Sequence, residues 1–170
     1  MPTLALDRPI ARNVTLDVLL CVVLVAVPAL SHAVAFPLYR FEPLRLLLFV
    51  AVLFSSRRNA LLMALWLPAL SMLTSGHPVF PKFVLIQGEL VLNTVIFYVL
   101  FSRSGRFVLG AAISVLASKV LYYAVKFVLI ELALMDGDLM ATPWTYQLAT
   151  LLFILVSGGV VCLLKEKARA

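Results

Sequence analysis

Long apolar runs alternate with short polar stretches along the whole chain. Six runs can be marked, and they are Leu16–Tyr39, Leu44–Ser56, Asn59–Leu73, Phe83–Phe101, Phe107–Leu134 and Thr142–Leu164. They lack the period-two alternation of a half-buried strand, and they are too long for strands. We therefore predict an all-α protein, a bundle of six helices that forms a single domain over residues 1–170.

The composition indicates that this bundle lies in a membrane. Of the 170 residues, 64% are hydrophobic and 13% are charged, whereas soluble domains have about 25% charged residues. The mean hydropathy is +1.09, and a soluble fold of this length could not bury so much apolar surface. The net charge of +6 lies in short clusters between the runs, as membrane topology requires, so we expect no nucleic acid partner.

Two of the runs are short for a membrane crossing, which takes about 20 residues. The second and third runs cross only if they tilt or if their ends extend into the flanking loops. The alternative is a re-entrant pair that enters from the outside. It would place Arg57 and Arg58 at membrane depth, which is costly. We therefore favour six transmembrane helices.

The distribution of Lys and Arg predicts the orientation. With the N-terminus in the cytoplasm, the outside loops hold only Arg40, Arg45 and Lys82. The inside segments then hold nine basic residues, namely Arg8, Arg12, Arg57, Arg58, Arg103, Arg106, Lys165, Lys167 and Arg169. Basic residues collect on the cytoplasmic side. We predict a multi-pass protein of the cell membrane with both termini cytoplasmic.

Three ionisable residues fall inside the later runs, where charge is costly enough to mark a candidate site. Glu89 lies about 10 Å below the outer start of its helix, and Asn93 lies one turn deeper. On the fifth run, Lys126 precedes Glu131 by five residues and lies about 8 Å below the outer end. Lys119 is two turns deeper on the same face. Glu89, Asn93, Lys119 and Lys126 form the predicted polar seam.

Other polar and aromatic groups lie at the same outer level. Tyr122 and Tyr123 fall between the two lysines, and Trp144 and Gln147 begin the sixth run. His77 adds a hydrogen-bonding group in the loop before the fourth run. The candidate binding residues are Glu89, Asn93, Lys119, Tyr123, Lys126, Trp144, Gln147 and His77. We interpret Trp66, which has no such neighbours, as part of an interfacial aromatic belt.

The polar seam has two interpretations. In one, Glu89 and Lys126 only pair to pin two helices together, or Lys126 extends to the outer headgroups. In the other, two lysines and one carboxylate leave a cation unmatched in an outer cavity. An unmatched cation suits an anionic or electron-rich ligand, and aromatic side chains beside it suit a flat ring.

The sequence has no signature of catalysis. It contains no phosphate-binding loop, HExxH, CxxC or GxSxG motif, so it cannot hydrolyse ATP by the usual route. Cys21 and Cys162 lie inside apolar runs, and neither His32 nor His77 has a metal-ligand partner at helical spacing. We expect no enzyme activity, no metal and no cofactor. A mixture of Glu, Asn, Lys and Tyr indicates ligand recognition instead.

One stretch carries a resemblance to a known family. "PALSMLTSGHPVFPKFVLIQGEL", the 23 residues Pro68–Leu90, resembles the region around the third loop of the substrate-binding S components of energy-coupling factor (ECF) transporters. The matching residues are Pro68, Ser71, Thr74, Gly76, Pro78, Pro81, Glu89 and Leu90. The length, the six helices and the cytoplasmic N-terminus are also similar to this family.

The resemblance implies a function in vitamin uptake. Family members are six-helix membrane proteins that bind a vitamin or related micronutrient near the outer face, and they dock on a membrane T component that two cytoplasmic ATPases drive. By this resemblance the first loop, Phe36–Pro43, is a lid, the third loop is Ser75–Lys82, and Ala29 and Ala33 meet the T component. The alternative is a non-transport six-helix scaffold subunit, such as a cell-shape or assembly protein.

Overall fold

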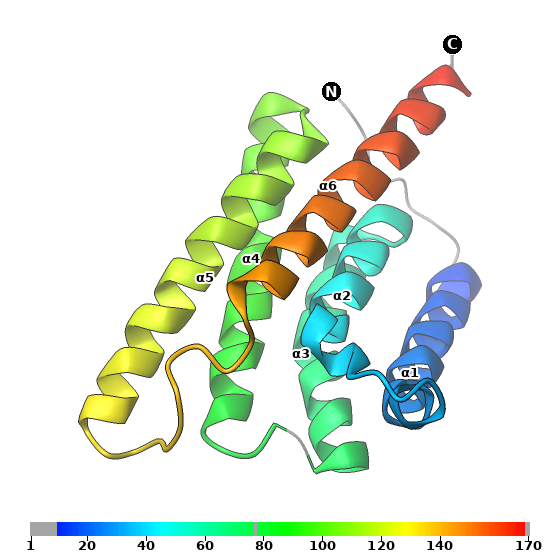
Figure 1. Cartoon of the computed structure of the whole chain (residues 1–170). Helices are drawn as coiled ribbons and strands as arrows, with labels where there is room; N and C mark the ends of the chain where they lie inside the picture. Colours follow the sequence, from blue (N-terminus) through cyan, green and yellow to red (C-terminus); the bar gives the residue numbers. More distant parts are fainter. Residues whose placement is uncertain (1–9, 77, 169–170) are drawn as a thin grey trace.

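The computed structural model describes residues 10–76 and 78–168. The helices are α1 (Ile10–Ala33), the short 3-10 helix η1 (Leu38–Phe41), α2 (Pro43–Phe54), α3 (Arg57–Ser75), α4 (Lys82–Ser104), α5 (Phe107–Glu131) and α6 (Trp144–Lys167) (Figure 1). All six predicted helices are present, and there is no strand in the two described ranges. The prediction of an all-α fold is confirmed.

The helix ends follow from glycine and proline. Gly76 ends α3 and Gly105 ends α4, with φ of 69° and 65°, a left-handed conformation that glycine adopts without strain. The largest difference from prediction is the first helix, which ends at Ala33 and not at Tyr39. The chain turns at Ala35, where φ is 50°, and Pro37 then precedes η1.

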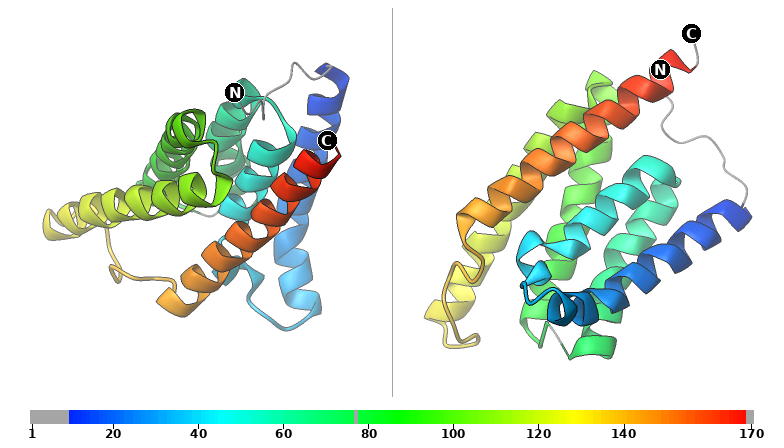
Figure 2. Two further views of the ribbon diagram at one scale, coloured as in Figure 1. Left: turned by 90° about the horizontal axis from the view of Figure 1, so that it is seen from above. Right: turned by 45° about the vertical axis from the view of Figure 1, so that its right-hand side comes forward.

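Successive helices run in alternating directions, and α2 lies inside the bundle (Figures 1 and 2). The short helix α2 contacts α1, α3, α4 and α6, whereas α1 packs only against α2, α3 and η1 at the edge of the bundle. Within the described residues α1 and α6 do not contact each other. The central position of α2 explains why its side chains are apolar nearly all round.

Four helices are long and apolar enough to cross a membrane: Asn13–Ala33 of α1, and α4, α5 and α6. The chain is therefore a multi-pass membrane protein. The 12 residues of α2 extend only about 18 Å at 1.5 Å per residue, less than the roughly 30 Å of a bilayer core. Complete crossing by α2 and α3, and the orientation of the bundle, stay predictions.

Aromatic packing forms the core toward one end of the bundle. Phe97 of α4 is fully buried, and its ring centroid lies 5.4 Å from that of Phe107, 5.6 Å from that of Phe101 and 6.0 Å from that of Phe49. Such ring pairs contribute about 0.5–1.5 kcal/mol beyond their buried area. This core joins α2, α4 and α5, and the polar residues described below lie farther along the same helices.

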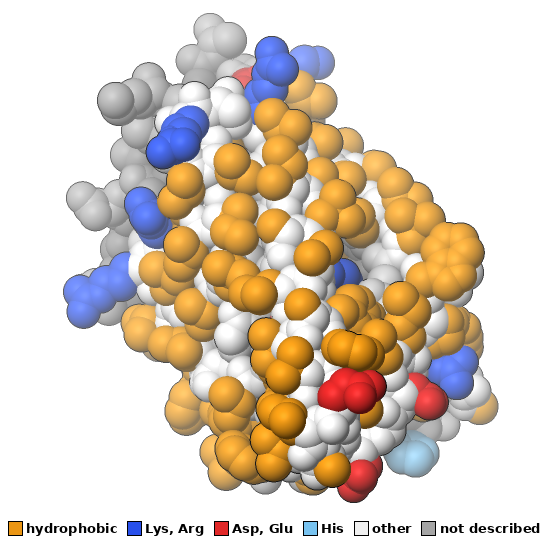
Figure 3. All heavy atoms as spheres, turned by 90° about the vertical axis from the view of Figure 1, so that its left-hand side faces the viewer, with side chains coloured by type: hydrophobic (Ala, Val, Ile, Leu, Met, Phe, Trp, Pro, Cys, Tyr) orange, Lys and Arg blue, Asp and Glu red, His pale blue; other side chains and the backbone are white. Residues whose placement is uncertain are grey.

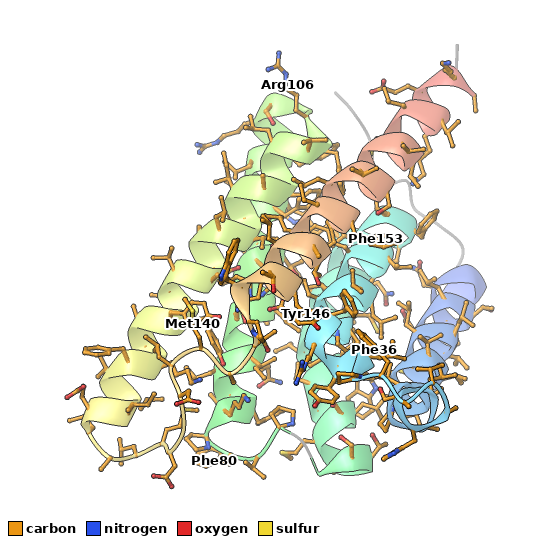
Figure 4. The ribbon with its side chains drawn as sticks, in the orientation of Figure 1. Phe36, Phe80, Arg106, Met140, Tyr146 and Phe153 are labelled. Carbon is orange, nitrogen blue, oxygen red and sulfur yellow. The ribbon has the colours of Figure 1, made fainter. Side chains whose placement is uncertain are left out.

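The outer surface is arranged as a membrane requires. Hydrophobic side chains cover most of the face on the α5 side, while Lys and Arg gather toward one end and Asp and Glu toward the other (Figure 3). Arg106, at the link between α4 and α5, marks the basic end (Figure 4). We call the opposite end, where η1 and the link between α5 and α6 lie, the acidic end.

Candidate functional site

An ion network lies inside the bundle where α2 begins. Arg45, in the first turn of α2, is 3% exposed. It pairs with Glu89 of α4 and, through Nη1, with Glu42 Oε2 at 2.7 Å. Lys119 of α5 donates from Nζ to Glu42 Oε1 at 2.5 Å. We call Glu42, Arg45, Glu89 and Lys119 the ion network, and it joins α2, α4 and α5.

Two members of this network were predicted to lie in the outer loops, and the structure corrects that assignment. Arg45 is buried and Glu42 is half-buried. The reason is that α2 is short and begins inside the bundle, level with the middle of its longer neighbours (Figure 1). Position alone could not reveal this. The spacing of the pair, an acidic and a basic residue three apart at the start of an apolar run, was the available signal.

The structure also corrects the predicted pairing of Glu89 with Lys126. Lys126 Nζ donates instead to the backbone oxygens of Asp138, at 2.6 Å, and Leu139, at 2.9 Å. Helices α4 and α5 separate toward the acidic end (Figure 1), so two side chains at similar depth face different surroundings. Lys126 therefore ties the link between α5 and α6 back onto α5.

The ion network balances its own charges. Its two cations, Arg45 and Lys119, face two carboxylates, Glu42 and Glu89, and the network is therefore neutral. Lys126 donates to backbone carbonyl oxygens, which do not cancel its charge. An anionic ligand therefore stays a prediction.

Unpaired polar atoms lie beside the network. Asn93 follows Glu89 by one turn of α4 and is 1% exposed. Its Oδ1 and Nδ2, and the Nε of Arg45, have no hydrogen-bond partner within residues 10–76 and 78–168. In folded proteins, roughly nine in ten or more of the buried polar groups have a hydrogen-bond partner. These atoms therefore mark the place where a ligand group could bind.

Tyr123 and Gln147 extend the polar region to α6. Gln147 Nε2 donates to the Tyr123 hydroxyl at 2.6 Å and to the Thr142 carbonyl oxygen at 2.7 Å. The Tyr123 ring centroid lies 5.9 Å from Lys119 Nζ. The structure thus brings Glu89, Lys119, Tyr123 and Gln147 into one connected region.

The remaining candidates lie elsewhere. Trp144, at the start of α6, is 65% exposed and belongs with the surface that faces lipid. Ala29 and Ala33 are exposed on α1, so they are accessible to a partner. His77 lies outside the described residues.

A cavity of about 550 Å³ lies on the other side of η1. It lies between α1 and α6, which do not contact each other within the described residues. Its walls are almost wholly apolar. The lining residues are Val23, Val27, Leu38, Phe41, Pro43, Leu46, Leu47, Ala149, Thr150 and Phe153. The labelled side chains Phe36, Tyr146 and Phe153 lie around this side of α2 (Figure 4). Sequence reasoning missed the cavity because no single run reveals a gap between two helices.

The first loop, which the structure bounds at residues 34–42, lies next to both the cavity and the ion network. Phe41 lines the cavity, and the next residue, Glu42, belongs to the network. The loop contacts α6 through Phe41, whose ring centroid is 5.3 Å from that of Tyr146, and through a 3.1 Å hydrogen bond from Thr150 Oγ1 to the Phe41 oxygen. The Arg40 guanidinium carbon lies 5.7 Å from the Tyr146 ring centroid, and the interaction with Tyr146 raises the pKa of Arg40.

The first loop has a left-handed residue at each end. Ala35 and Glu42 both have φ of 50°, a conformation that costs a non-glycine residue about 1–2 kcal/mol. Strained backbone of this kind persists only where the surroundings hold it.

No family model, curated protein or solved structure matches the chain.

Proposed function

We propose that this protein is a membrane-embedded substrate-binding subunit of an ATP-driven importer, of the kind represented by ECF S components, and that it captures a micronutrient at its acidic end. One observation carries the proposal. A strained loop lies next to both a cavity of about 550 Å³ and a buried polar region, and ligand pockets measure about 300–1,000 Å³.

In this proposal the first loop is the lid. Movement about Ala35 and Glu42 would join the apolar cavity to the unpaired atoms of Asn93 and Arg45. A ligand that contacts both sides binds the closed loop more tightly than the open one, and this differential affinity drives closure. The backbone strain at both hinges reduces the free-energy difference between the closed and the open loop.

The lining predicts the chemistry of the ligand. Apolar walls and a neutral ion network favour a largely apolar molecule with a few hydrogen-bonding groups. Asn93 offers one donor group and one acceptor, and the Tyr123 ring offers an aromatic face. A polyanion would have to displace Glu42 or Glu89, which makes it the poorer candidate.

A partner would supply the energy. Because the sequence has no ATP-binding motif, inward transport requires a membrane T component and two cytoplasmic ATPases. The exposed pair Ala29 and Ala33 on α1 is a surface of small residues that lets another helix approach closely.

The test is ligand capture by the purified protein. We expect one compound in a panel of water-soluble vitamins and related micronutrients to raise the thermal unfolding midpoint. We also expect mass spectrometry of the denatured protein to find the same compound. Asn93→Leu should abolish this shift yet leave the unliganded midpoint equal or higher, because it removes buried unpaired polar atoms. Asp138→Asn, an exposed change in the loop, is the control.

The rival function, a structural scaffold, is favoured by one observation. All four charges of the ion network are satisfied within the protein, as a purely structural network would be. A scaffold binds none of the panel and releases no enriched small molecule. That combined result would exclude the importer proposal.

A further inference from the structure

A second groove lies at the basic end of the bundle, between α1 and α3, and the proposed function does not use it. Its volume is about 420 Å³. The lining residues are Asp17, Val18, Cys21, Val22, Asn59, Leu62, Met63 and Trp66. Only Asp17 and Asn59 in this set are strongly polar, and they lie together.

Asp17 is the unusual member. It lies inside the candidate span Asn13–Ala33, where an ionisable residue is a functional candidate by default. Asn59 Nδ2 donates to its Oδ1 at 2.7 Å. No other described residue donates to Asp17, so Oδ2 can accept a hydrogen bond from outside. The hydropathy pattern does not single out this carboxylate, because Asp17 is the second residue of its apolar run.

The polar pair lies at the mouth of the groove. Asp17 follows the start of the span by four residues, about 6 Å at 1.5 Å per residue, and Asn59 is the third residue of α3. Both are thus near the level where headgroups meet acyl chains. Trp66 lies about 10 Å farther along α3 than Asn59 and is 52% exposed. It lines the groove, and its place in an interfacial belt stays a prediction.

A cation flanks the mouth. Arg58 is exposed and precedes Leu62 by one turn, on the side of α3 next to the groove. Arg57, by contrast, lies over the Tyr98 ring of α4, 5.5 Å from its centroid. The mouth therefore presents a carboxylate on α1, and the same end of α3 carries an exposed guanidinium, with an apolar channel behind the mouth.

We propose that this groove binds a phospholipid with a primary-amine headgroup, from the leaflet at the basic end. The ammonium group donates to Asp17 Oδ2, the phosphate pairs with Arg58, and an acyl chain lies along Val22, Leu62 and Trp66. A choline headgroup has no N–H to donate, and a glycerol headgroup has no positive charge. This inference is independent of the importer proposal.

The test compares headgroups on the intact protein. The protein is reconstituted in bilayer discs that contain equal amounts of phosphatidylethanolamine, phosphatidylcholine and phosphatidylglycerol, and native mass spectrometry counts the lipids that stay bound. We expect ethanolamine lipid to exceed choline lipid by about threefold or more, since a charge-assisted hydrogen bond distinguishes them. Equal retention of the two by the wild-type protein would overturn the proposal, with no variant needed.

Two variants locate the site. Asp17→Asn preserves the shape and should remove the preference for ethanolamine lipid, whereas Glu131→Gln removes an exposed charge at the other end and should preserve it. Leu62→Trp fills the groove and should lower retention of every lipid. An unchanged preference in Asp17→Asn, or unchanged retention in Leu62→Trp, contradicts the assignment. Thermal unfolding confirms that each variant is folded.

Discussion

At the scale of single residues, the environment of each charge decides its role. Glu89, seven residues into α4, is a membrane carboxylate by position, and the sequence can say that much. Its partner, Arg45, comes from the start of a different helix. Both side chains are more than nine-tenths buried, so neither can be solvated if the other is lost.

Removal of Arg45 alone should therefore be more damaging than removal of the pair. Arg45→Leu leaves Glu89 buried and unpaired, and we expect it to lower the free energy of unfolding by about 3 kcal/mol or more. Arg45→Leu combined with Glu89→Leu should recover most of this loss, because Glu42 keeps Lys119 as partner. Thermal or denaturant unfolding of both variants in detergent measures the difference.

Arg103→Leu is the control for this pair. Arg103 is exposed at the end of α4, and such changes fall within about 0.5 kcal/mol of neutral. A double variant as unstable as the sum of its single changes would show that Arg45 and Glu89 act independently.

The hinge residue Ala35 gives a prediction of the opposite sign. Ala35→Gly relieves the left-handed conformation and should leave the unfolding midpoint equal or higher, whereas Ala35→Val should lower it, since a branched residue is poorly tolerated there. Ala133, with φ of 53°, lies outside the first loop. Ala133→Gly should have the same stability effect.

The two glycine variants should differ in ligand release. Once a ligand is identified, Ala35→Gly should release it faster than the wild type because it frees a hinge of the lid. Ala133→Gly should not. Equal release rates for both would assign the first loop a structural role only.

At the scale of elements, close helix contacts hold the bundle together. Gly158 of α6 faces Phe107 at the start of α5, and a Cβ at this position would overlap the Phe107 ring. Gly88 of α4 has nothing within 4 Å of a Cβ. The two glycines look alike in the sequence, and only the packing separates them.

We expect Gly158→Ala to destabilise the protein by about 1–3 kcal/mol, because overpacking displaces a ring from the aromatic core. Gly88→Ala should be neutral or stabilising by up to about 1 kcal/mol, since alanine is the better helix former. Phe107→Leu in the Gly158→Ala background should restore part of the loss. Midpoints from thermal unfolding test all three, and equal effects of the two glycine changes would contradict the contact.

At the scale of the whole molecule, α2 and α3 differ from the other helices in their relation to the membrane. Both are less suited to a span than the other four helices, and α2 is enclosed by its neighbours. A short helix can be tolerated there because other helices, rather than lipid, surround its backbone.

Accessibility of single cysteines should settle the topology. After Cys21 and Cys162 are replaced by alanine, a membrane-impermeant thiol reagent should label Asp136→Cys in intact cells. It should label Arg58→Cys and Ser104→Cys only after permeabilisation, because the basic clusters predict that end to be cytoplasmic. Labelling of Ser104→Cys alone after permeabilisation, with Arg58→Cys unreactive, would favour the re-entrant pair.

The sequence by itself determined the helices. Runs of this length and apolarity can satisfy their backbone hydrogen bonds in lipid only as helices. It also placed Glu89, Lys119, Tyr123 and Gln147 in the same half of the bundle. Pattern along one chain fixes depth because each residue advances a helix by a constant rise.

Only the tertiary structure decided which residues meet. The partnership of Arg45 with Glu89, the link from Lys126 to the loop carbonyls, the cavity beside η1 and the exposure of Asp17 in a groove all depend on how the helices rotate, tilt and diverge. A hydropathy pattern records which residues avoid water. It does not record which neighbouring helix each face turns toward, since lipid and protein interior are equally apolar.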